Sequence, residues 1–443
     1  MRKIIALLLL FTFSSNVEAQ EAQSFSLEDA VQYALKHSLE IRNADISVAD
    51  ADQRINENKA LGLPTVSANF GFVHNFKLAD FIVQRGIFQG MPVEGEFEKI
   101  PPLGALDNRT TATLDAQSLV FDWSYLTALK AARAYRTFSA EEKTQTIQAV
   151  KNQVRSAYLP PLILEESKKT LAKNISNLEK LLFETRELYK AGFVEQLDID
   201  RLELSLANLN TELDNLDRQK EITYNVLKIA MNYPMDQPIA IADNIDLLLT
   251  EAPVDDLEGN INYANRPEYR VATMGQTLNE INIDYIKATY YPNLVGFAQY
   301  QQIGQSLDFF NNNIWTSQGY VGLTLNVPIY SGGGKKAQLQ RAKLDLEKTR
   351  NQIRSLERVI WMEVGNARIG YKNALRRVAD QERNLKLAQK IYDTTQIKYR
   401  EGVGSSLEIT NAEQSLFQSQ QNVIQARYEL LQAKVDLDQA LGR

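Results

Sequence analysis

Two stretches of this 443-residue chain carry the same pattern, so the fold must contain one structural unit twice. Residues 189–199 match residues 399–409 at a shift of 210, and Glu203, Ser205 and Leu206 continue the match, which brings the identities to seven. So many identities at a single shift indicate a tandem duplication and exclude any fold without internal symmetry.

The duplication predicts a common order of elements in two repeats. We expect the first repeat over residues 20–259 and the second over residues 260–443. Each should contain a helix, a strand pair, a long helix and a return helix. The predicted strand pairs are 64–75 with 111–122, and 292–301 with 318–329. The first repeat also carries an insertion at 76–110 and ends in a mixed segment at 233–259.

The longest predicted helices are too long for a compact globular domain. Residues 124–191 contain no glycine, and 26–62 contain no glycine or proline before Gly62. At 1.5 Å per residue, the first of these helices would be on the order of 100 Å long. Pro160 and Pro161 are expected to kink it or to break its hydrogen-bond ladder.

The last predicted helix carries a heptad pattern that indicates coiled-coil packing. One row of large apolar residues recurs every seven positions, and a row of small residues follows three positions later. The large row is Ile409, Leu416, Val423, Leu430 and Leu437, and the small row is Ala412, Ser419, Ala426, Ala433 and Ala440. One narrow seam of this helix should therefore face a neighbouring helix.

The predicted strands leave two interpretations open. In residues 320–329, Val321, Leu323 and Leu325 alternate with polar or small residues, which is typical of a sheet with one apolar face. Such strands fit a small soluble sheet packed on helices. They also fit lipid-facing strands of a barrel with a polar lumen. Four strands cannot close a barrel, so the second interpretation requires several chains to share one.

Composition argues against an enzyme. The chain has no cysteine and only two histidines, His37 and His74, so thiol chemistry and most histidine-based acid–base or metal chemistry are excluded. Neither a catalytic residue, a cofactor site nor a metal site is expected. An exported hydrolase that uses pairs of acids is disfavoured because the acids lie scattered along helix faces.

Residues 1–19 predict export from the cytoplasm. Arg2 and Lys3 precede an apolar run, and small residues follow it, as in a cleaved signal peptide. The run is too short for the roughly 20 residues that span a bilayer. Removal of two basic residues and one acid changes the net charge from −6 to −7, which disfavours nucleic-acid binding.

Several motifs give the chain a family resemblance. "LVFDWS" and "NVPIYSGGG" precede the two long helices, and "YKAGFVEQLDI" and "YREGVGSSLEI" form the two turns. In this order and duplication they resemble the TolC-like outer-membrane efflux proteins, also called outer membrane factors. The resemblance covers essentially the whole mature chain. It implies a mainly α fold with β: a long α-helical barrel continued by a transmembrane β-barrel, with four strands per protomer in a twelve-stranded trimeric barrel.

The resemblance also implies a function. Such a homotrimer sits in outer-membrane lipid with a long periplasmic extension, and is the exit channel of a tripartite efflux or type I secretion system. It passively conducts substrates that an inner-membrane pump and a periplasmic adaptor deliver. The alternative is a soluble periplasmic coiled-coil adaptor or scaffold protein. The sequence does not distinguish drugs, metal ions and proteins as cargo.

The turns carry the site residues that the resemblance implies. Asp198 and Tyr399 align with the inter-helix lock of the periplasmic gate, and Glu408 and Asn411 align with its two acidic rings. The basic residue of the family lock falls on Gly404, so the gate here should be looser or held otherwise. Plain helix initiation at Asp198 and Glu408 is an alternative role. The hairpin tips, as possible adaptor contacts, are Gly192, Phe193, Val194, Gly402, Val403 and Gly404.

Overall fold

The computed structural model of the chain describes residues 23–100, 106–250, 258–307 and 314–443, and the predicted signal peptide lies outside them. The chain divides into two compact units. Unit 1 comprises the described parts of 1–47, 140–272 and 352–443, and unit 2 comprises those of 48–139 and 273–351. Each unit therefore takes segments from both sequence repeats.

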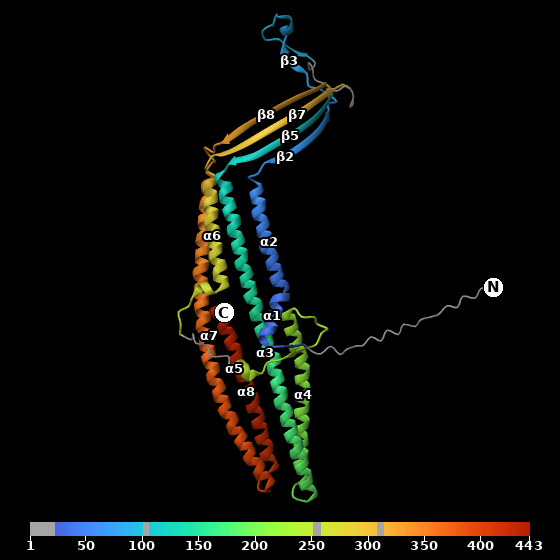
Figure 1. Cartoon of the computed structure of the whole chain (residues 1–443), viewed down its shortest axis with the longest axis vertical. Coiled ribbons are helices and arrows are strands. Elements are labelled where there is room, and N and C mark those ends of the chain that lie inside the picture. Colours follow the sequence, from blue (N-terminus) through green and yellow to red (C-terminus); the bar gives the residue numbers. More distant parts are fainter. Residues whose placement is uncertain (1–22, 101–105, 251–257, 308–313) are drawn as a thin grey trace, which may run out of the picture. The chain divides into compact units, whose positions relative to one another are not determined.

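Long helices dominate the described residues (Figure 1). Helix α3 spans Trp123–Lys190 and α7 spans Gly334–Arg400, and each is followed by a shorter return helix. These return helices are α4 (Gln196–Met231) and α8 (Ser406–Leu441). None of the helices in the described ranges is long and apolar enough to cross a membrane.

The predicted helix over 26–62 is wrong at one point. The structure divides it into α1 (Leu27–His37) and α2 (Leu39–Ala60) at Ser38, whose backbone is extended. The Ser38 hydroxyl accepts a hydrogen bond from Ile41 N–H at 3.4 Å, and the Asn232 side chain donates to the His37 carbonyl at 2.7 Å. Serine is a favoured cap residue: the Ser38 backbone N–H donates to Ala34 O at the end of α1, and its hydroxyl helps to start α2.

Helix α3 continues through Pro160 and Pro161 without a break. The residues on either side of the prolines, Leu159 and Leu162, are 1% and 3% exposed. Both pack in a core cluster with Ile245 of α5 (Ile245–Thr250) and with residues of α8. This burial offsets the backbone donors that the prolines remove.

The heptad seam of α8 is confirmed. All five large residues of the predicted row are buried, with exposures of 7% or less. The small residues Ala412, Ala426 and Ala440 of the second row are buried too. The N-terminal part of α8 packs in a cluster that also contains Leu178 of α3, Leu202 of α4 and Tyr392 of α7. Four helices therefore share one core in this part of unit 1.

A second core of unit 1 contains a short parallel strand pair. Strand β1 (Gln23–Phe25) pairs with β6 (Ile239–Ile241). The Tyr158 hydroxyl donates to the Phe25 carbonyl at 2.9 Å and contacts Asp243 Oδ2 at 3.0 Å. Burial raises the pKa of this tyrosine well above its ordinary value, so the group stays a neutral donor.

Unit 2 contains a four-stranded antiparallel sheet in the order β2-β5-β7-β8 (Figure 1). Its strands are β2 (Thr65–His74), β5 (Asn108–Phe121), β7 (Asn293–Ser306) and β8 (Ile314–Asn326). All four differ from the predicted bounds. Strand β2 is one residue shorter at each end, β5 begins earlier and β7 ends later than expected, and β8 begins earlier and ends earlier. Unit 2 also contains most of α6 (Pro267–Ala288).

The described part of the insertion at 76–110 contains a hairpin of its own. Strands β3 (Phe81–Gln84) and β4 (Phe97–Ile100) pair antiparallel, and a short 3-10 helix, η1 (Ile87–Gln89), lies between them. The sequence predicted an insertion here without strands, whereas the structure forms a strand pair in it; residues 101–105 lie outside the described residues.

Candidate functional site

The sheet of unit 2 has two chemically different faces. Ser67 and Asn69 of β2 share one face with Thr113 and Asp115 of β5, because these residues pair across the strands. Gln299 and Gln301 of β7 lie opposite Asp115 and Thr113, and Tyr320 and Gln318 of β8 lie opposite those two glutamines. The alternation of strand side chains thus gathers polar groups from all four strands on one face.

Hydrogen bonds connect that polar face from edge to edge. Asn69 donates to Asp115 Oδ2 at 3.3 Å, and Gln299 donates to Asp115 Oδ1. Gln318 donates to Gln301 Oε1 at 2.8 Å, and Gln301 donates to Thr113 at 3.3 Å. A face made of such hydrogen-bonding side chains is suited to contact with water.

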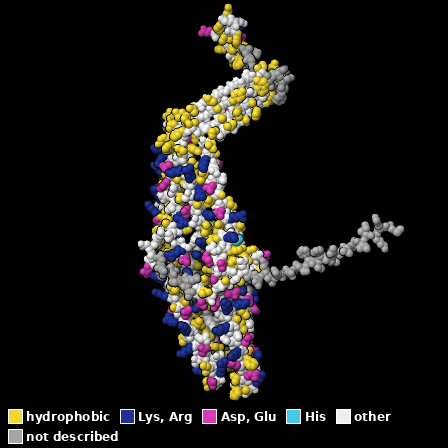
Figure 2. All heavy atoms as spheres, in the orientation of Figure 1, with side chains coloured by type: hydrophobic (Ala, Val, Ile, Leu, Met, Phe, Trp, Pro, Cys, Tyr) yellow, Lys and Arg dark blue, Asp and Glu magenta, His cyan; other side chains and the backbone are white. Residues whose placement is uncertain are grey.

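The opposite face is apolar and exposed. Val66 and Phe70 of β2 are 67% and 83% exposed, and Val321 and Leu323 of β8 are 83% and 68% exposed. Figure 2 shows hydrophobic side chains gathered over the strands, whereas charged side chains are spread over the helices. Strands β2 and β8 are also the two edges of the sheet, each with one side unpaired by the described residues. Unpaired edges beside an exposed apolar face call for further partners.

In unit 1, both helical hairpins turn at a glycine with left-handed backbone. Gly192 has φ of +78° and Gly402 has φ of +75°, a region that L side chains rarely adopt. Gly192 N–H donates to Tyr189 O at 2.9 Å and Gly402 N–H to Tyr399 O at 3.1 Å. At the tips, Phe193 is 78% exposed and Val403 is 77% exposed, and Val194 is half-buried.

The close packing of the second turn explains why position 404 is a glycine. A Cβ built on Gly404 would lie 3.1 Å from Tyr399 N and 3.2 Å from Lys398 C, which is tighter than ordinary contact. Gly404 N–H also donates to Lys398 O at 3.1 Å. The tight turn therefore disfavours any side chain here, and the basic residue of the family lock has no equivalent at this position.

Asp198 has two separate roles in the structure. Its Oδ2 accepts a hydrogen bond from Glu195 N–H at 3.0 Å, which caps the first turn of α4. Its Oδ1 accepts a hydrogen bond from the Ser406 hydroxyl on α8. Arg201 donates to Ser406 Oγ at 2.9 Å and lies 3.9 Å from Asp198 Oδ1. Asp198, Ser406 and Arg201 thus form a polar cluster, named here the tip cluster, between two helices.

Tyr399 also bonds across helices, but to a partner that the sequence did not indicate. Its hydroxyl lies 3.3 Å from Thr185 Oγ1 on α3, and Thr185 is fully buried. Burial raises the pKa of the Tyr399 hydroxyl, so this group is neutral near pH 7. No hydrogen bond among the described residues joins Tyr399 directly to Asp198.

A third contact near the turns was not predicted either. The Arg400 guanidinium donates to both carboxylate oxygens of Glu184, from Nε at 2.9 Å and from Nη2 at 3.1 Å. This two-pronged geometry joins α7 to α3 one residue beyond Tyr399. The two side chains are 44% and 32% exposed, so the pair contributes modestly to stability.

Glu408 and Asn411 both lie exposed near the start of α8. Glu408 N–H donates to the Ser405 hydroxyl at 3.3 Å, which supports helix initiation, the alternative role expected for Glu408. The Glu408 and Asn411 side chains are open to solvent, so the structure brings neither into the tip cluster. Their expected place in acidic rings stays a prediction.

Comparison with known proteins gives the class. The family model for the outer membrane efflux protein matches residues 30–232 and 262–443. The chain therefore belongs to the outer membrane efflux protein family, which places it in the outer membrane with a long periplasmic helical extension. The family consists of channels.

Two curated relatives show how distant the sequence similarity is. The chain is 22% identical over 273 residues to nodulation protein T of Rhizobium leguminosarum bv. trifolii, and 22% identical over 296 residues to the pyoverdine export outer membrane protein OpmQ of Pseudomonas aeruginosa. These alignments cover 60% and 66% of this chain but only 57% and 60% of the relatives, less than two thirds of their length.

The fold similarity extends further. The open state of the Neisseria gonorrhoeae MtrE outer membrane channel matches with a TM-score of 0.69 and 17% identity over 94% of this chain and 88% of that one. The expected TolC-like fold is thereby confirmed.

Proposed function

We propose that the protein is the outer-membrane exit channel of a tripartite efflux or type I secretion system. The observation that carries this proposal is the two-faced sheet of unit 2, in which a hydrogen-bonded polar face backs an exposed apolar face. A soluble sheet would bury its apolar face. A sheet between water and lipid would leave both faces as they are.

The open edges β2 and β8 support assembly from several copies. Each edge strand has an unpaired side, and unpaired backbone groups are too costly to leave in lipid. Three copies that join β8 of one to β2 of the next would close the sheet into a barrel, as in the family. The polar faces would then line a water-filled lumen.

The helical hairpins of unit 1 would form the periplasmic end of this channel. In this proposal, the contacts of Asp198 with Ser406 and of Tyr399 with Thr185 hold the hairpins together in the resting state. An adaptor approaches the exposed tips at Phe193 and Val403, and a pump supplies the energy. The channel itself is passive and carries out no catalysis.

One purified sample tests the proposal. The full-length protein should need detergent for extraction, show the mass of a trimer in native mass spectrometry and open single channels in planar bilayers. The rival function, a soluble periplasmic coiled-coil adaptor, would instead give a detergent-free preparation without conductance. The relative OpmQ is named as a pyoverdine export protein, so a small organic molecule is a candidate cargo here. A strain that lacks this protein should then accumulate the exported molecule inside the cell.

A further inference from the structure

A cavity of about 290 Å³, partly open to solvent, lies between four helices of unit 1. Residues of four helices line it: Asn174 and Asn177 of α3, Ser205, Asn208, Leu209 and Glu212 of α4, Tyr392 of α7, and Glu413, Gln414, Leu416 and Phe417 of α8. At about 30 Å³ per water-sized group, the cavity holds roughly ten such groups. This is the size of a small ligand.

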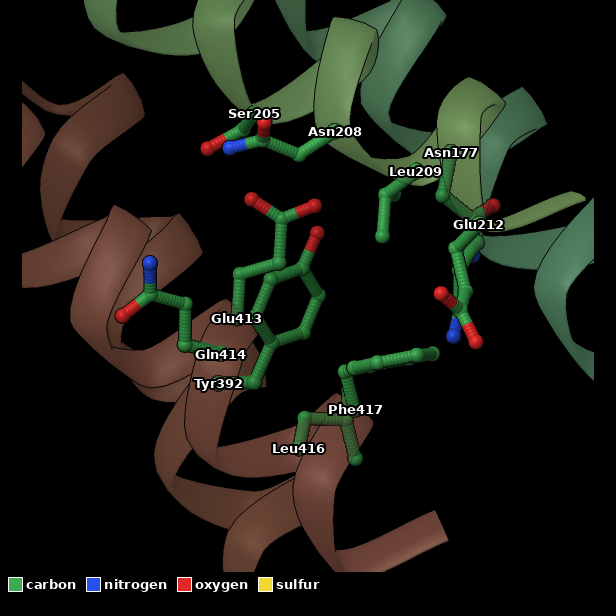
Figure 3. Close-up of a pocket in the computed structure, with 11 residues that line it drawn as sticks. Asn177, Ser205, Asn208, Leu209, Glu212, Tyr392, Glu413, Gln414, Leu416 and Phe417 are labelled. Atoms are coloured by element: carbon green, nitrogen blue, oxygen red, sulfur yellow. The ribbon is translucent and has the colours of Figure 1, made fainter. Parts of the chain in front are cut away.

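The cavity contains a carboxylate oxygen without a partner. Glu413 Oε2 is buried and, among the described residues, accepts no hydrogen bond. Figure 3 shows the Glu413 carboxylate and the Tyr392 hydroxyl pointing toward Ser205 and Asn208 of α4. Burial raises the pKa of Glu413 to about 7, so the charged form is present near neutral pH but poorly compensated. A bound cation would supply the missing partner.

The rest of the lining favours an organic cation over a metal ion. Leu209, Leu416 and Phe417 supply apolar contacts, and Tyr392 and Phe417 are aromatic, a residue type that attracts cations. Glu212 is a second acid in the lining, and the described lining residues include no Lys or Arg. In the described parts of the chain, no cluster of three or more His, Cys, Asp or Glu could hold a metal.

We propose that this cavity is a binding site for a small organic cation, an amine with a short apolar body. The ammonium group would pair with Glu413, and the apolar body would lie against Leu209 and Phe417. Because the cavity draws on both helical hairpins, a bound amine would also join α4 to α8. The proposal concerns binding alone and does not require that the protein conduct anything.

The probe is 2-phenylethylamine, and its neutral counterpart is 2-phenylethanol. Both are titrated by calorimetry into the full-length protein in detergent micelles, with protein-free micelles as the blank. We expect the amine to bind at pH 8 and the alcohol to bind at least tenfold more weakly. With a Glu413 pKa of about 7, affinity for the amine should fall by up to about tenfold at pH 6.

Two variants and a matched control make the test specific. Glu413→Gln keeps the shape but removes the charge, and should weaken amine binding at least tenfold at pH 8 and abolish its pH dependence. Asn208→Trp keeps the acid but fills the cavity, and should also abolish binding. Glu179→Gln makes the same acid-to-amide change at an exposed position of α3 and should bind like the wild type. Each variant is checked by circular dichroism.

Three results would overturn the proposal. Equal affinity for the amine and the alcohol would show that charge plays no part. Unchanged binding in Glu413→Gln would place the amine elsewhere. Displacement of the amine by potassium at equal concentration would show a site for small inorganic cations instead.

Discussion

The Ser406 hydroxyl donates a hydrogen bond to Asp198 Oδ1 although the two residues lie 208 positions apart. Ser406 is 2% exposed and begins α8, whereas Asp198 lies in the first turn of α4. The bond therefore connects the starts of the two return helices, one from each sequence repeat. A partly buried hydrogen bond to a carboxylate is among the stronger single contacts in a protein.

Ser406→Ala should loosen the tip without disturbing the cap of α4. The change removes the contact to Asp198 Oδ1 and the acceptor of Arg201, and it leaves Asp198 Oδ2 bonded to Glu195 N–H. A hydrogen bond to a charged group stabilises by about 1.5–3 kcal/mol, so the open population per protomer should rise roughly 10- to 150-fold. Single-channel recording should show a higher resting conductance.

The neighbouring serine provides the control for this variant. Ser405 caps α8 through Glu408 N–H, and no hydrogen bond of the described residues links it to α4. Ser405→Ala should lower the stability of α8 by about 1 kcal/mol with little change in resting conductance. If both serine variants leak equally, fraying of α8 rather than the tip cluster controls the resting state.

Tyr399 and Thr185 should act as one unit in the same recordings. Tyr399→Phe and Thr185→Val each remove the same 3.3 Å contact, at a cost of about 0.5–1.5 kcal/mol. The double variant should then raise leak conductance no more than either single variant. Additive effects would mean that the two hydroxyls act independently, and a Tyr399→Phe trimer no leakier than the wild type would mean that Tyr399 acts by packing alone. Tyr189→Phe, at a tyrosine that is 43% exposed, is the matched control.

The sequence predicted those features that depend on a local period. The heptad identified the buried seam from Ile409 to Leu437, and alternation located the strands around Val66 and Val321. Both signals arise because burial on one face repeats with the geometry of the element itself. The break at Ser38 was not predicted because a single serine is common within a helix. Its position is marked only in the folded chain, where the Asn232 side chain bonds to the His37 carbonyl.

The side-chain partners at the tip could not be predicted in the same way. The sequence pointed to Asp198 and Tyr399, but their partners Ser406 and Thr185 depend on how four helices are set against each other. That setting is a property of the packed core, and no local pattern encodes it. Glu413 was missed for the same reason, since nothing in its own helix distinguishes it from the exposed acids nearby.

Glu408→Gln should weaken block by divalent cations applied from the periplasmic side. In the proposed trimer, three exposed carboxylates would face one constriction, and their removal lowers the attraction for a cation there. The half-blocking concentration of Mg²⁺ should rise several-fold in planar bilayers. Asn411→Asp adds three charges at the second ring position and should lower the half-blocking concentration of Mg²⁺. If neither variant changes the block, these residues lie outside the ion path.

Glu413→Gln should stabilise the protein at alkaline pH and leave its stability near pH 4 unchanged. Burial raises the pKa of Glu413 from 4.5 to about 7, so the folded state holds a proton that the unfolded state releases between these values. Stability in the wild type therefore falls as pH rises from 4.5 to 7, by about 3 kcal/mol in total, and stays low above pH 7. Glutamine has no proton to lose, so the variant should lack this fall. Thermal unfolding at pH 5 and pH 8 measures the difference, with Glu179→Gln expected to follow the wild type; parallel wild-type and Glu413→Gln curves would mean that Glu413 is solvated in the folded protein.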